Sequence, residues 1–208
     1  TLTNLLTAPD RPFYAIVGGA KVGSKIGVLR SLADKVDHLF IGGGMAYTFL
    51  QTQGITIGDS IFDRDNSDVA RALLTSHGDK ISLPEDFIIT DGSAIKTITI
   101  ADGIPDGWEG MDIGPATLKK WSEKLGTGKT VFWNGPVGVF ENPNFALGTE
   151  KIAHLLADLG GTTIAGGGDS IAAIQKCHLV NNFTHISTGG GACLELIEFG
   201  TLPALEQM

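Results

Sequence analysis

The sequence predicts a three-layer, doubly wound (Rossmann-like) α/β fold, in which helices cover both faces of a six-stranded parallel sheet. Three observations predict this fold class. Short and almost continuously apolar runs alternate along the chain with segments of helical periodicity. Such apolar runs are typical of parallel strands, which are buried on both faces. Glycine, at 29 of 208 residues, is about twice as frequent as in an average protein and gathers where the apolar runs end.

Six apolar runs are the expected strands of the sheet. Four of them lead into glycine clusters, in YAIVGGAK (Tyr14–Lys21), HLFIGGGM (His38–Met45), TTIAGGGD (Thr162–Asp169) and THISTGGGA (Thr184–Ala192). The fifth, TVFWNGPVG (Thr130–Gly138), ends in a Gly-Pro turn, and the sixth, DFIIT (Asp86–Thr90), ends at an Asp-Gly pair. We expect TITIA (Thr97–Ala101) to be a minor strand and residues 102–112 to be a loop.

The helices are expected between these strands, where apolar residues recur at helical spacing. In Lys25–Lys35 the apolar residues Ile26, Leu29, Leu32 and Ala33 fall on one face. Similar patterns occupy Asp68–Leu74, Pro115–Leu125, Thr149–Leu159, Ile171–Cys177 and Ala192–Glu198. The length of the chain suits one large α/β domain, and we expect residues 1–208 to form a single domain.

The charge balance argues against nucleic acid and anionic membranes as partners. The net charge is −8, and no basic stripe offsets this acidic field. The longest apolar runs have the length of strands, so we expect no transmembrane helix. The first ten residues lack the features of a signal peptide, and Cys177 and Cys193 lack the spacing of metal ligands. We therefore expect a cytoplasmic protein.

The glycine clusters, far apart in the sequence, are expected to meet in space. In a parallel sheet the carboxyl ends of all strands lie at one edge, and ligands bind there. A single glycine cluster at a strand-to-helix turn is commonly explained by the turn itself or by close packing. Four such clusters favour a ligand site at this edge.

Two familiar nucleotide motifs are not supported. GTGKT (Gly126–Thr130) is similar to a P-loop, but Glu123 stands where that motif requires glycine, and the segment precedes a strand instead of following one. GGAKVG (Gly18–Gly23) approaches the dinucleotide fingerprint. The second strand, however, ends in three glycines where that fingerprint requires an acid for the ribose. An NAD-dependent oxidoreductase half is therefore the weaker alternative.

Phosphate binding explains the remaining polar residues better. Lys21 and Lys25 lie four residues apart at the start of the first helix, a spacing that can aim both at one point. Residues 168–170 open another helix, whose free amides and dipole attract an anion. Asp169 is either the N-cap of that helix or the anchor of a Mg²⁺ ion shared with the phosphates. Glu141 is a second acid at this edge and is suited to accept from ribose hydroxyls.

Six motifs carry a resemblance over nearly the whole chain, from about Arg11 to Leu202. They are RPFYAIVGGAKVGSKI, IGGGMAYTF, MDIGP, VFWNGPVGVFE, IAGGGDSIAAI and HISTGGGACLELIE, in the order and spacing of one family. The chain resembles the C-terminal, nucleotide-binding domain of phosphoglycerate kinase. Ser170 departs from the threonine that is common at its position, and Cys193 departs from serine. Gly23 and Ser24 alter the start of the first helix without affecting the two lysines.

The resemblance implies a role for each matching residue. It implies that Lys25 contacts the nucleotide phosphates and that Lys21 steadies the transferred phosphoryl group. It implies an adenine pocket formed by Gly43, Gly44, Gly110, Met111 and Val139, with Asn134 and Glu141 near the phosphates and the ribose. It implies a loop for phosphate and Mg²⁺ that consists of Gly167, Gly168, Asp169 and Ser170, with Asp169 on the metal side. Residues 189–191 would line the transfer site, and Gly168 and Gly190 count among the catalytic residues.

The resemblance also implies the reaction and a missing partner. The family moves a phosphoryl group reversibly between 1,3-bisphosphoglycerate and ADP, giving ATP and 3-phosphoglycerate in glycolysis. The family's N-terminal domain, which binds 3-phosphoglycerate, has no counterpart here, and residues 1–9 resemble the helix that links the two domains. We therefore expect a monomeric C-terminal domain that binds Mg-ADP or Mg-ATP without appreciable kinase activity. A nucleotide-binding sensor or scaffold module is the alternative.

Overall fold

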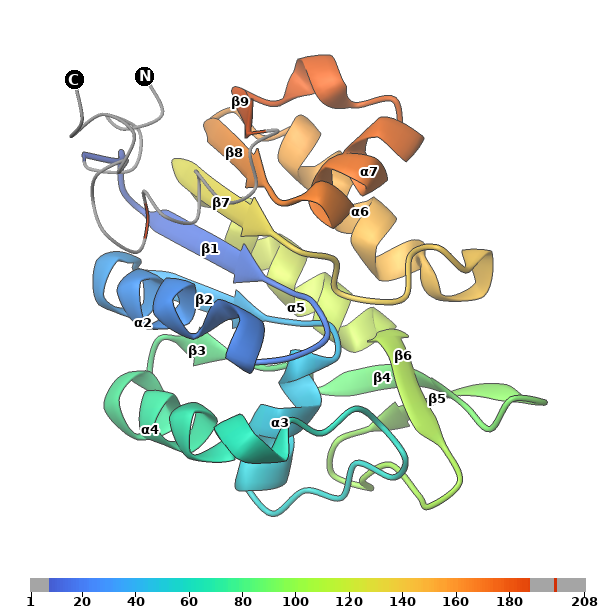
Figure 1. Ribbon diagram of the computed structural model, residues 1–208. Coiled ribbons are helices and arrows are strands. Elements are labelled where there is room, and N and C mark those ends of the chain that lie inside the picture. The colour runs from blue at the N-terminus through green and yellow to red at the C-terminus, as the bar shows by residue number, and fades with distance from the viewer. Residues whose placement is uncertain (1–7, 188–196, 198–208) are drawn as a thin grey trace.

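A computed structural model describes residues 8–187 and residue 197, which form two sheets with helices packed around them (Figure 1). The larger sheet has six parallel strands in the order β3-β2-β1-β7-β8-β9. Its strands are β1 (Phe13–Val17), β2 (His38–Ile41), β3 (Ile81–Ser82), β7 (Thr130–Asn134), β8 (Thr162–Gly166) and β9 (His185–Ser187). The predicted six-stranded parallel sheet is confirmed.

Helices cover both faces of this sheet, which confirms the predicted three layers. In β1, Phe13, Ala15 and Val17 belong to one hydrophobic core, and Tyr14 and Ile16 belong to the other. The first core also contains residues of α2 (Ile26–Lys35), α3 (Met45–Thr52) and α4 (Ser67–His77). The second core contains residues of α5 (Pro115–Leu125), α6 (Leu147–Ala157) and α7 (Gly168–Lys176). Because both faces are packed, the central strands are apolar along most of their length.

Five of the six predicted helices are confirmed, with shifts of a few residues at most ends. Helix α5 has the predicted bounds, with a proline at its first position, where the missing N–H costs no hydrogen bond. The sixth predicted helix, Ala192–Glu198, lies outside the described residues apart from Ile197. In the described part of the chain, four short 3₁₀ helices connect the elements: η1 (Gly23–Lys25), η2 (Arg64–Asn66), η3 (Pro143–Phe145) and η4 (Val180–Asn182). Within residues 8–187, no helix has the length and apolar character needed to cross a membrane.

The prediction that Asp86–Thr90 belongs to the parallel sheet is wrong. As β4 it is the central strand of a separate antiparallel sheet, between β5 (Ile95–Thr99) and β6 (Glu109–Ile113). The connection from β4 to β5 turns sharply at Gly92, which has a φ of +88°. A hairpin of this kind joins antiparallel neighbours, whereas parallel neighbours need a long crossover.

Two smaller strand predictions need correction for the same reason. The minor strand expected at residues 97–101 lies at Ile95–Thr99, and the loop expected over residues 102–112 ends in strand β6. The sixth strand of the large sheet is the two-residue β3, which is too short to leave an apolar pattern.

Helix α3 gave no sequence signal because it lies between the two sheets. All residues from Met45 to Leu50 are buried, so the helix has no polar face over that stretch. Met45 and Phe49 pack in the core of the large sheet, while Tyr47 and Leu50 pack with Phe87 in the core of the small sheet. A helix enclosed on all sides lacks the amphipathic period by which surface helices are recognised.

The order of the strands creates a switch point between β1 and β7. From β1 the chain adds β2 and β3 in one direction, and from β7 it adds β8 and β9 in the other. Strands β1 and β7 are paired, with Val17 opposite Asn134 at their carboxyl ends. Because the connections diverge there, a crevice opens at that edge, and this is where open α/β sheets bind ligands.

Candidate functional site

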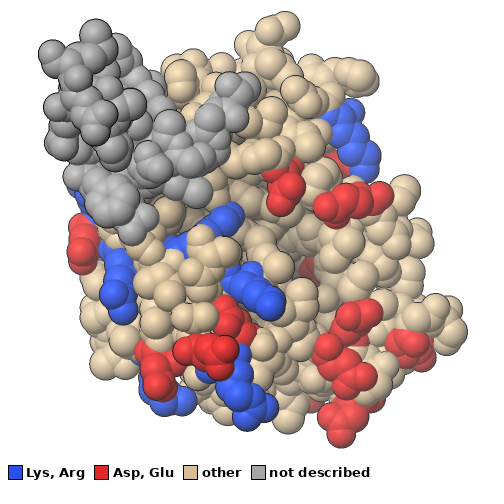
Figure 2. Space-filling model, viewed as in Figure 1, with Lys and Arg blue, Asp and Glu red and all other residues tan. Residues whose placement is uncertain are grey.

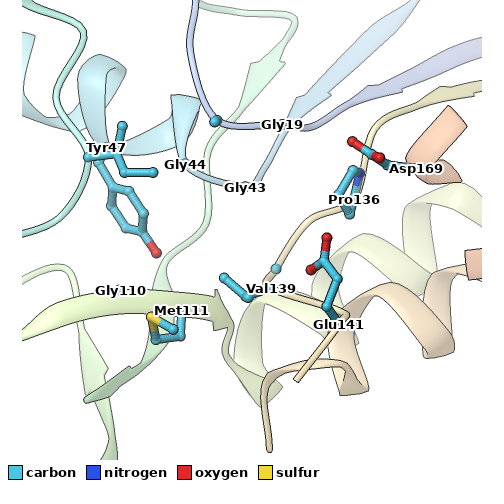
Figure 3. A pocket seen from close by; sticks show the side chains of 13 residues that line it. Gly19, Gly43, Gly44, Tyr47, Gly110, Met111, Pro136, Val139, Glu141 and Asp169 are labelled. Atoms are coloured by element: carbon cyan, nitrogen blue, oxygen red, sulfur yellow. The ribbon is translucent and has the colours of Figure 1, made fainter. Parts of the chain in front are cut away.

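A cavity of about 260 Å³ lies at the switch point, between the carboxyl edge of the large sheet and strand β6 (Figure 3). Its lining comes from the turns after β1, β2 and β7, from β6 and from the start of α7. Seven of the residues expected in the site line it: Gly43, Gly44, Gly110, Met111, Val139, Glu141 and Asp169. The expected convergence is therefore confirmed for the three glycine clusters before residue 188, and the fourth, with Gly190, lies outside the described residues.

Backbone forms one wall of the cavity, because three turns interlock there. Gly19 N donates to Pro136 O at 3.1 Å, and Gly43 N donates to Val137 O at 3.2 Å. Gly43 has a φ of +67°, and a Cβ on it would overlap the backbone of Gly19 and Pro136. Both the conformation and the space available therefore require glycine at this position.

Lys25 lies at the seam between β1 and β7, beside the cavity. Its ammonium donates to Gly18 O at 2.7 Å and to Asn134 O at 3.1 Å. Burial lowers the pKa of Lys25 to about 8, against the opposing effect of the Asp169 carboxylate. The site thus has a cation that is held in place by backbone carbonyls and largely desolvated.

The expectation that Lys21 and Lys25 both lie at the start of the first helix is wrong for Lys21. Lys21 is exposed in the loop before η1, and regular α-helix begins only at Ile26. The conformation of this loop, and not the periodicity of a helix, therefore decides whether both ammonium groups can contact one ligand.

Asp63, which no sequence motif indicated, anchors this loop. Its carboxylate accepts hydrogen bonds from Gly23 N at 2.8 Å and from Asn66 Nδ2 at 2.9 Å. Desolvation opposes ionisation of Asp63, but these hydrogen bonds and the charge of Lys21 outweigh it, so the pKa of Asp63 lies below its usual value. The loop that carries Lys21 is therefore held by a charged group from the segment after α3.

The start of α7 borders the cavity through Asp169. The N-cap of α7 is Gly167, with a φ of +91°, and no side chain caps this helix. Asp169 lies in the first helical turn and is exposed, so the alternative that it serves as the N-cap is wrong. The first amides of an α-helix have no partner within the helix, and this end consequently favours an anion.

Asn134 and Ser170 hold the turns around the cavity together. Both are buried, and neither is part of the cavity lining. Asn134 Nδ2 donates to Gly166 O at 2.9 Å, and Ser170 Oγ accepts from Gly135 N at 2.6 Å. Their side chains therefore join the ends of β7, β8 and α7, and a direct contact of either with phosphate stays a prediction.

Two carboxylates, Asp169 and Glu141, lie on the same side of the cavity (Figure 3). Figure 2 shows this face of the molecule hollowed, with both basic and acidic side chains around the hollow. In the part of the chain that the structure describes, no three His, Cys, Asp or Glu side chains form a group that could hold a metal alone. The oxygen donors present suit Mg²⁺, which commonly binds one or two carboxylates together with the phosphate oxygens of a ligand.

The opposite side of the cavity is apolar. Met111 on β6 and Val139 after β7 are joined by a hydrogen bond from Val139 N to Met111 O at 2.8 Å. Ile61 and Tyr47 also line the cavity. Tyr47 belongs to the IGGGMAYTF motif, which implied no role for it, and Ile61 belongs to none of the motifs. Val139 is 40% exposed and Ile61 is 45% exposed, which is unusual for large apolar side chains gathered in a hollow. Exposed apolar surface of this kind is typical of a ligand pocket.

Asp112 holds the strand on the apolar side of the cavity in place. Its buried carboxylate accepts from Gly148 N at 2.8 Å and from Ile113 N at 2.9 Å, so it joins β6 to the start of α6. Burial raises the pKa of Asp112 to about 7, although the two amides oppose the shift. The strand that carries Met111 is thereby tied to the helix that follows Val139 and Glu141.

Comparison with known proteins assigns the chain to a family. The family model described as phosphoglycerate kinase matches residues 1–199. The chain belongs to the phosphoglycerate kinase family. It is 49% identical over 213 residues to the cytosolic phosphoglycerate kinase of Triticum aestivum, covering 98% of this chain and 53% of that protein. It is 50% identical over 207 residues to the phosphoglycerate kinase of Synechococcus elongatus, covering 95% of this chain and 51% of that protein.

The fold agrees with solved members of the phosphoglycerate kinase family. The phosphoglycerate kinase of Coxiella burnetii superposes with a TM-score of 0.94 at 38% identity, covering 99% of this chain and 55% of that one. The enzyme of Pyrococcus horikoshii superposes with a TM-score of 0.86 at 31% identity, covering 99% of this chain and 53% of that one. The chain therefore spans about half the length of the relatives it matches.

Proposed function

We propose that this chain is the nucleotide-binding half of a phosphoglycerate kinase and that its cavity binds ATP or ADP. One observation carries the proposal: the cavity at the switch point has an apolar side and, at its other end, the start of α7, and the Lys25 ammonium lies directly behind Gly19 in the cavity wall. A nucleotide offers the matching pair of chemistries, a flat base and a charged phosphate chain. The base would lie against Met111 and Val139, beside the backbone of Gly43, Gly44 and Gly110.

The phosphates would lie toward Lys25 and the start of α7. Lys25 would neutralise phosphate charge, and the amides at Gly167, Gly168 and Ser170 would donate to phosphate oxygens. Lys21 would steady the phosphoryl group during transfer, because its exposed position leaves its ammonium able to move toward the ligand. Gly190 is proposed for the same step through its backbone.

Asp169 would hold Mg²⁺ together with the phosphates, and Glu141 would accept from the ribose hydroxyls. When bound, Mg²⁺ supplies positive charge that offsets the negative charge of the transferring group. A carboxylate so close to an anion site is tolerable if a cation lies between the two charges. Asp169 would otherwise repel the phosphates that Lys25 attracts.

The reaction would need a partner domain. We propose that a domain binding 3-phosphoglycerate presents its substrate to this cavity, so that a phosphoryl group passes between 1,3-bisphosphoglycerate and ADP. Closure of the two domains would exclude water and align the reacting oxygens, which is most of what a protein contributes to phosphoryl transfer. We place the protein in the cytoplasm as a monomer, in keeping with relatives that are named cytosolic.

The purified chain is expected to bind Mg-ADP and Mg-ATP but to convert 3-phosphoglycerate and ATP at a negligible rate. The nucleotide site lies within residues that fold together, whereas alignment with the second substrate requires the partner domain. Titration calorimetry measures the binding, and a coupled assay for ADP release measures turnover. Absence of binding would contradict the nucleotide proposal, and appreciable turnover by the chain alone would contradict the need for a second domain.

Asp169→Ala is expected to abolish the gain in nucleotide affinity that Mg²⁺ confers, a loss of about tenfold if one charge-assisted contact is removed. Binding of metal-free ATP should stay equal or strengthen slightly, because the variant has one negative charge fewer near the phosphates. Calorimetry with and without Mg²⁺ measures both quantities. Asp158→Ala, at an exposed position after α6, is the matched control and should keep the full effect of Mg²⁺. If Asp169→Ala also kept the gain in affinity that Mg²⁺ confers, Asp169 would not be the metal anchor.

A further inference from the structure

The side chain of Tyr47 is buried, but its hydroxyl has no hydrogen-bond partner among the described residues. Tyr47 lies on α3, is only 3% exposed, and packs its ring on Phe87 with the ring centroids 4.9 Å apart. Residues 8–187 and 197 provide no hydrogen bond to this hydroxyl, although every fully enclosed side-chain oxygen or nitrogen among them has a partner. The Tyr47 oxygen is therefore not sealed in the core. It reaches the cavity that Tyr47 lines.

The residues around the Tyr47 hydroxyl indicate which part of a bound ligand would contact it. It lies beside Gly110, where a Cβ would collide with it, so the chain leaves room for the phenol at this point of the wall. In Figure 3 the phenol lies across the cavity from Asp169 and Glu141 and near Met111 and Gly110. It is therefore on the apolar side, away from the groups suited to phosphate. Buried tyrosine hydroxyls usually have a hydrogen-bond partner, because an unmade bond is costly.

We propose that the Tyr47 hydroxyl hydrogen-bonds to the edge of the nucleobase and so contributes to the base-dependent part of nucleotide affinity. The inference rests on the proposed binding of ADP and ATP in this cavity, and adds a residue that recognises the base. Burial, and then the nearby Asp112 and Glu109, raise the pKa of Tyr47 above its usual value, so the phenol keeps its proton. A neutral phenol both donates and accepts. It can therefore pair with a ring nitrogen, an exocyclic amine or a 6-oxo group of a purine.

Tyr47→Phe removes this oxygen alone and keeps the ring that packs on Phe87. We expect the dissociation constant for ADP to rise about 3- to 10-fold, which is the usual effect of losing one neutral hydrogen bond. Pyrophosphate, which has the phosphates but no base, should bind to the variant and to the wild type equally. Calorimetric titration with each ligand measures the two effects, and the unfolding temperature without ligand shows that the variant is folded.

Tyr14→Phe is the matched control, since Tyr14 is the only other tyrosine of the chain. Its hydroxyl pairs with Thr127 Oγ1 at 3.1 Å, at the amino end of β7 and so at the opposite edge of the sheet. This variant should bind ADP as the wild type does.

The outcomes separate the inference from the proposed function. Equal affinity of Tyr47→Phe and the wild type for ADP would overturn the role of Tyr47 and leave the nucleotide proposal standing. Equal weakening of ADP and pyrophosphate would also overturn it, because the hydroxyl would then act on the shape of the site and not on the base. Failure of the wild type to bind ADP would overturn both.

Discussion

Lys25→Met is expected to weaken the binding of Mg-ADP about 100-fold. The change preserves most of the length and volume of the side chain but removes the ammonium that donates to Gly18 O and Asn134 O. A cation that the protein has already desolvated attracts phosphate far more strongly than one surrounded by water. The proposed phosphate site would lose this cation while keeping its backbone amides. Titration calorimetry of both proteins at the same pH and salt concentration measures the loss.

The pH dependence of binding reports on the same ammonium. Burial lowers the pKa of Lys25 to about 8, so the group is charged below that pH and increasingly neutral above it. An anion binds the charged form. Wild-type affinity for Mg-ADP should therefore fall as the pH rises from about 7 to about 9, and the affinity of Lys25→Met should change much less.

Lys129→Met is the matched control for Lys25→Met. Lys129 is exposed and directly precedes β7, so it lies at the opposite edge of the sheet and carries the same charge. Its replacement should change the affinity for Mg-ADP by less than about twofold, through long-range charge alone. If the two variants bind Mg-ADP equally well, Lys25 is not a phosphate ligand.

The carboxyl edge of the large sheet could be predicted because its residues follow directly from the ends of strands. Gly43 and Gly44 come after β2, Val139 comes in the segment after β7, and Asp169 comes at the start of the helix after β8. Parallel strands bring such positions to one edge whatever their distance in the sequence. The sequence alone therefore predicts that these residues lie around one cavity.

The apolar side of the cavity could not be derived in that way. It depends on the antiparallel sheet and on α3, which pack against each other through Tyr47 and Phe87. Helix α3 has no polar face, and β6 begins with the exposed Glu109. Neither segment therefore shows the hydrophobic periodicity by which a helix or a strand is recognised in a sequence. Gly110 and Met111 were expected in the site through family resemblance alone. Tyr47 lies within the IGGGMAYTF motif, but the resemblance implied no role for it, and Ile61 lies in none of the motifs.

The lysine spacing shows a different limit. Lys21 and Lys25 are four positions apart, which on a regular helix would place them on one face. The segment is instead a loop followed by the 3₁₀ turn η1, and the carboxylate of Asp63 holds it through Gly23 N. A contact with a residue 40 positions away therefore decides the local conformation. No pattern within the segment contains that information.

Gly135→Ala is expected to lower the free energy of unfolding by about 3 kcal/mol and to abolish nucleotide binding. Gly135 follows β7 at the switch point and has a φ of +94°, a conformation that side chains disfavour. A Cβ there would also collide with Gly18 O and with the Lys25 ammonium. The turn cannot shift freely to relieve this, because Gly135 N donates to Ser170 Oγ and Gly135 O accepts from Trp133 Nε1.

The matched control for this substitution is Gly160→Ala, on the amino side of β8. Gly160 has no positive φ, and a Cβ there would meet no atom within 4 Å, so its replacement should change stability by less than about 0.5 kcal/mol. Urea unfolding followed by circular dichroism measures both variants, and calorimetry measures their binding of Mg-ADP. If Gly135→Ala were as stable as Gly160→Ala, the turn after β7 could shift to accommodate a Cβ, and the expectation that its hydrogen bonds hold it in place would be wrong. If it were stable and also bound Mg-ADP, the position of Lys25 between Gly18 and Asn134 would not matter for binding.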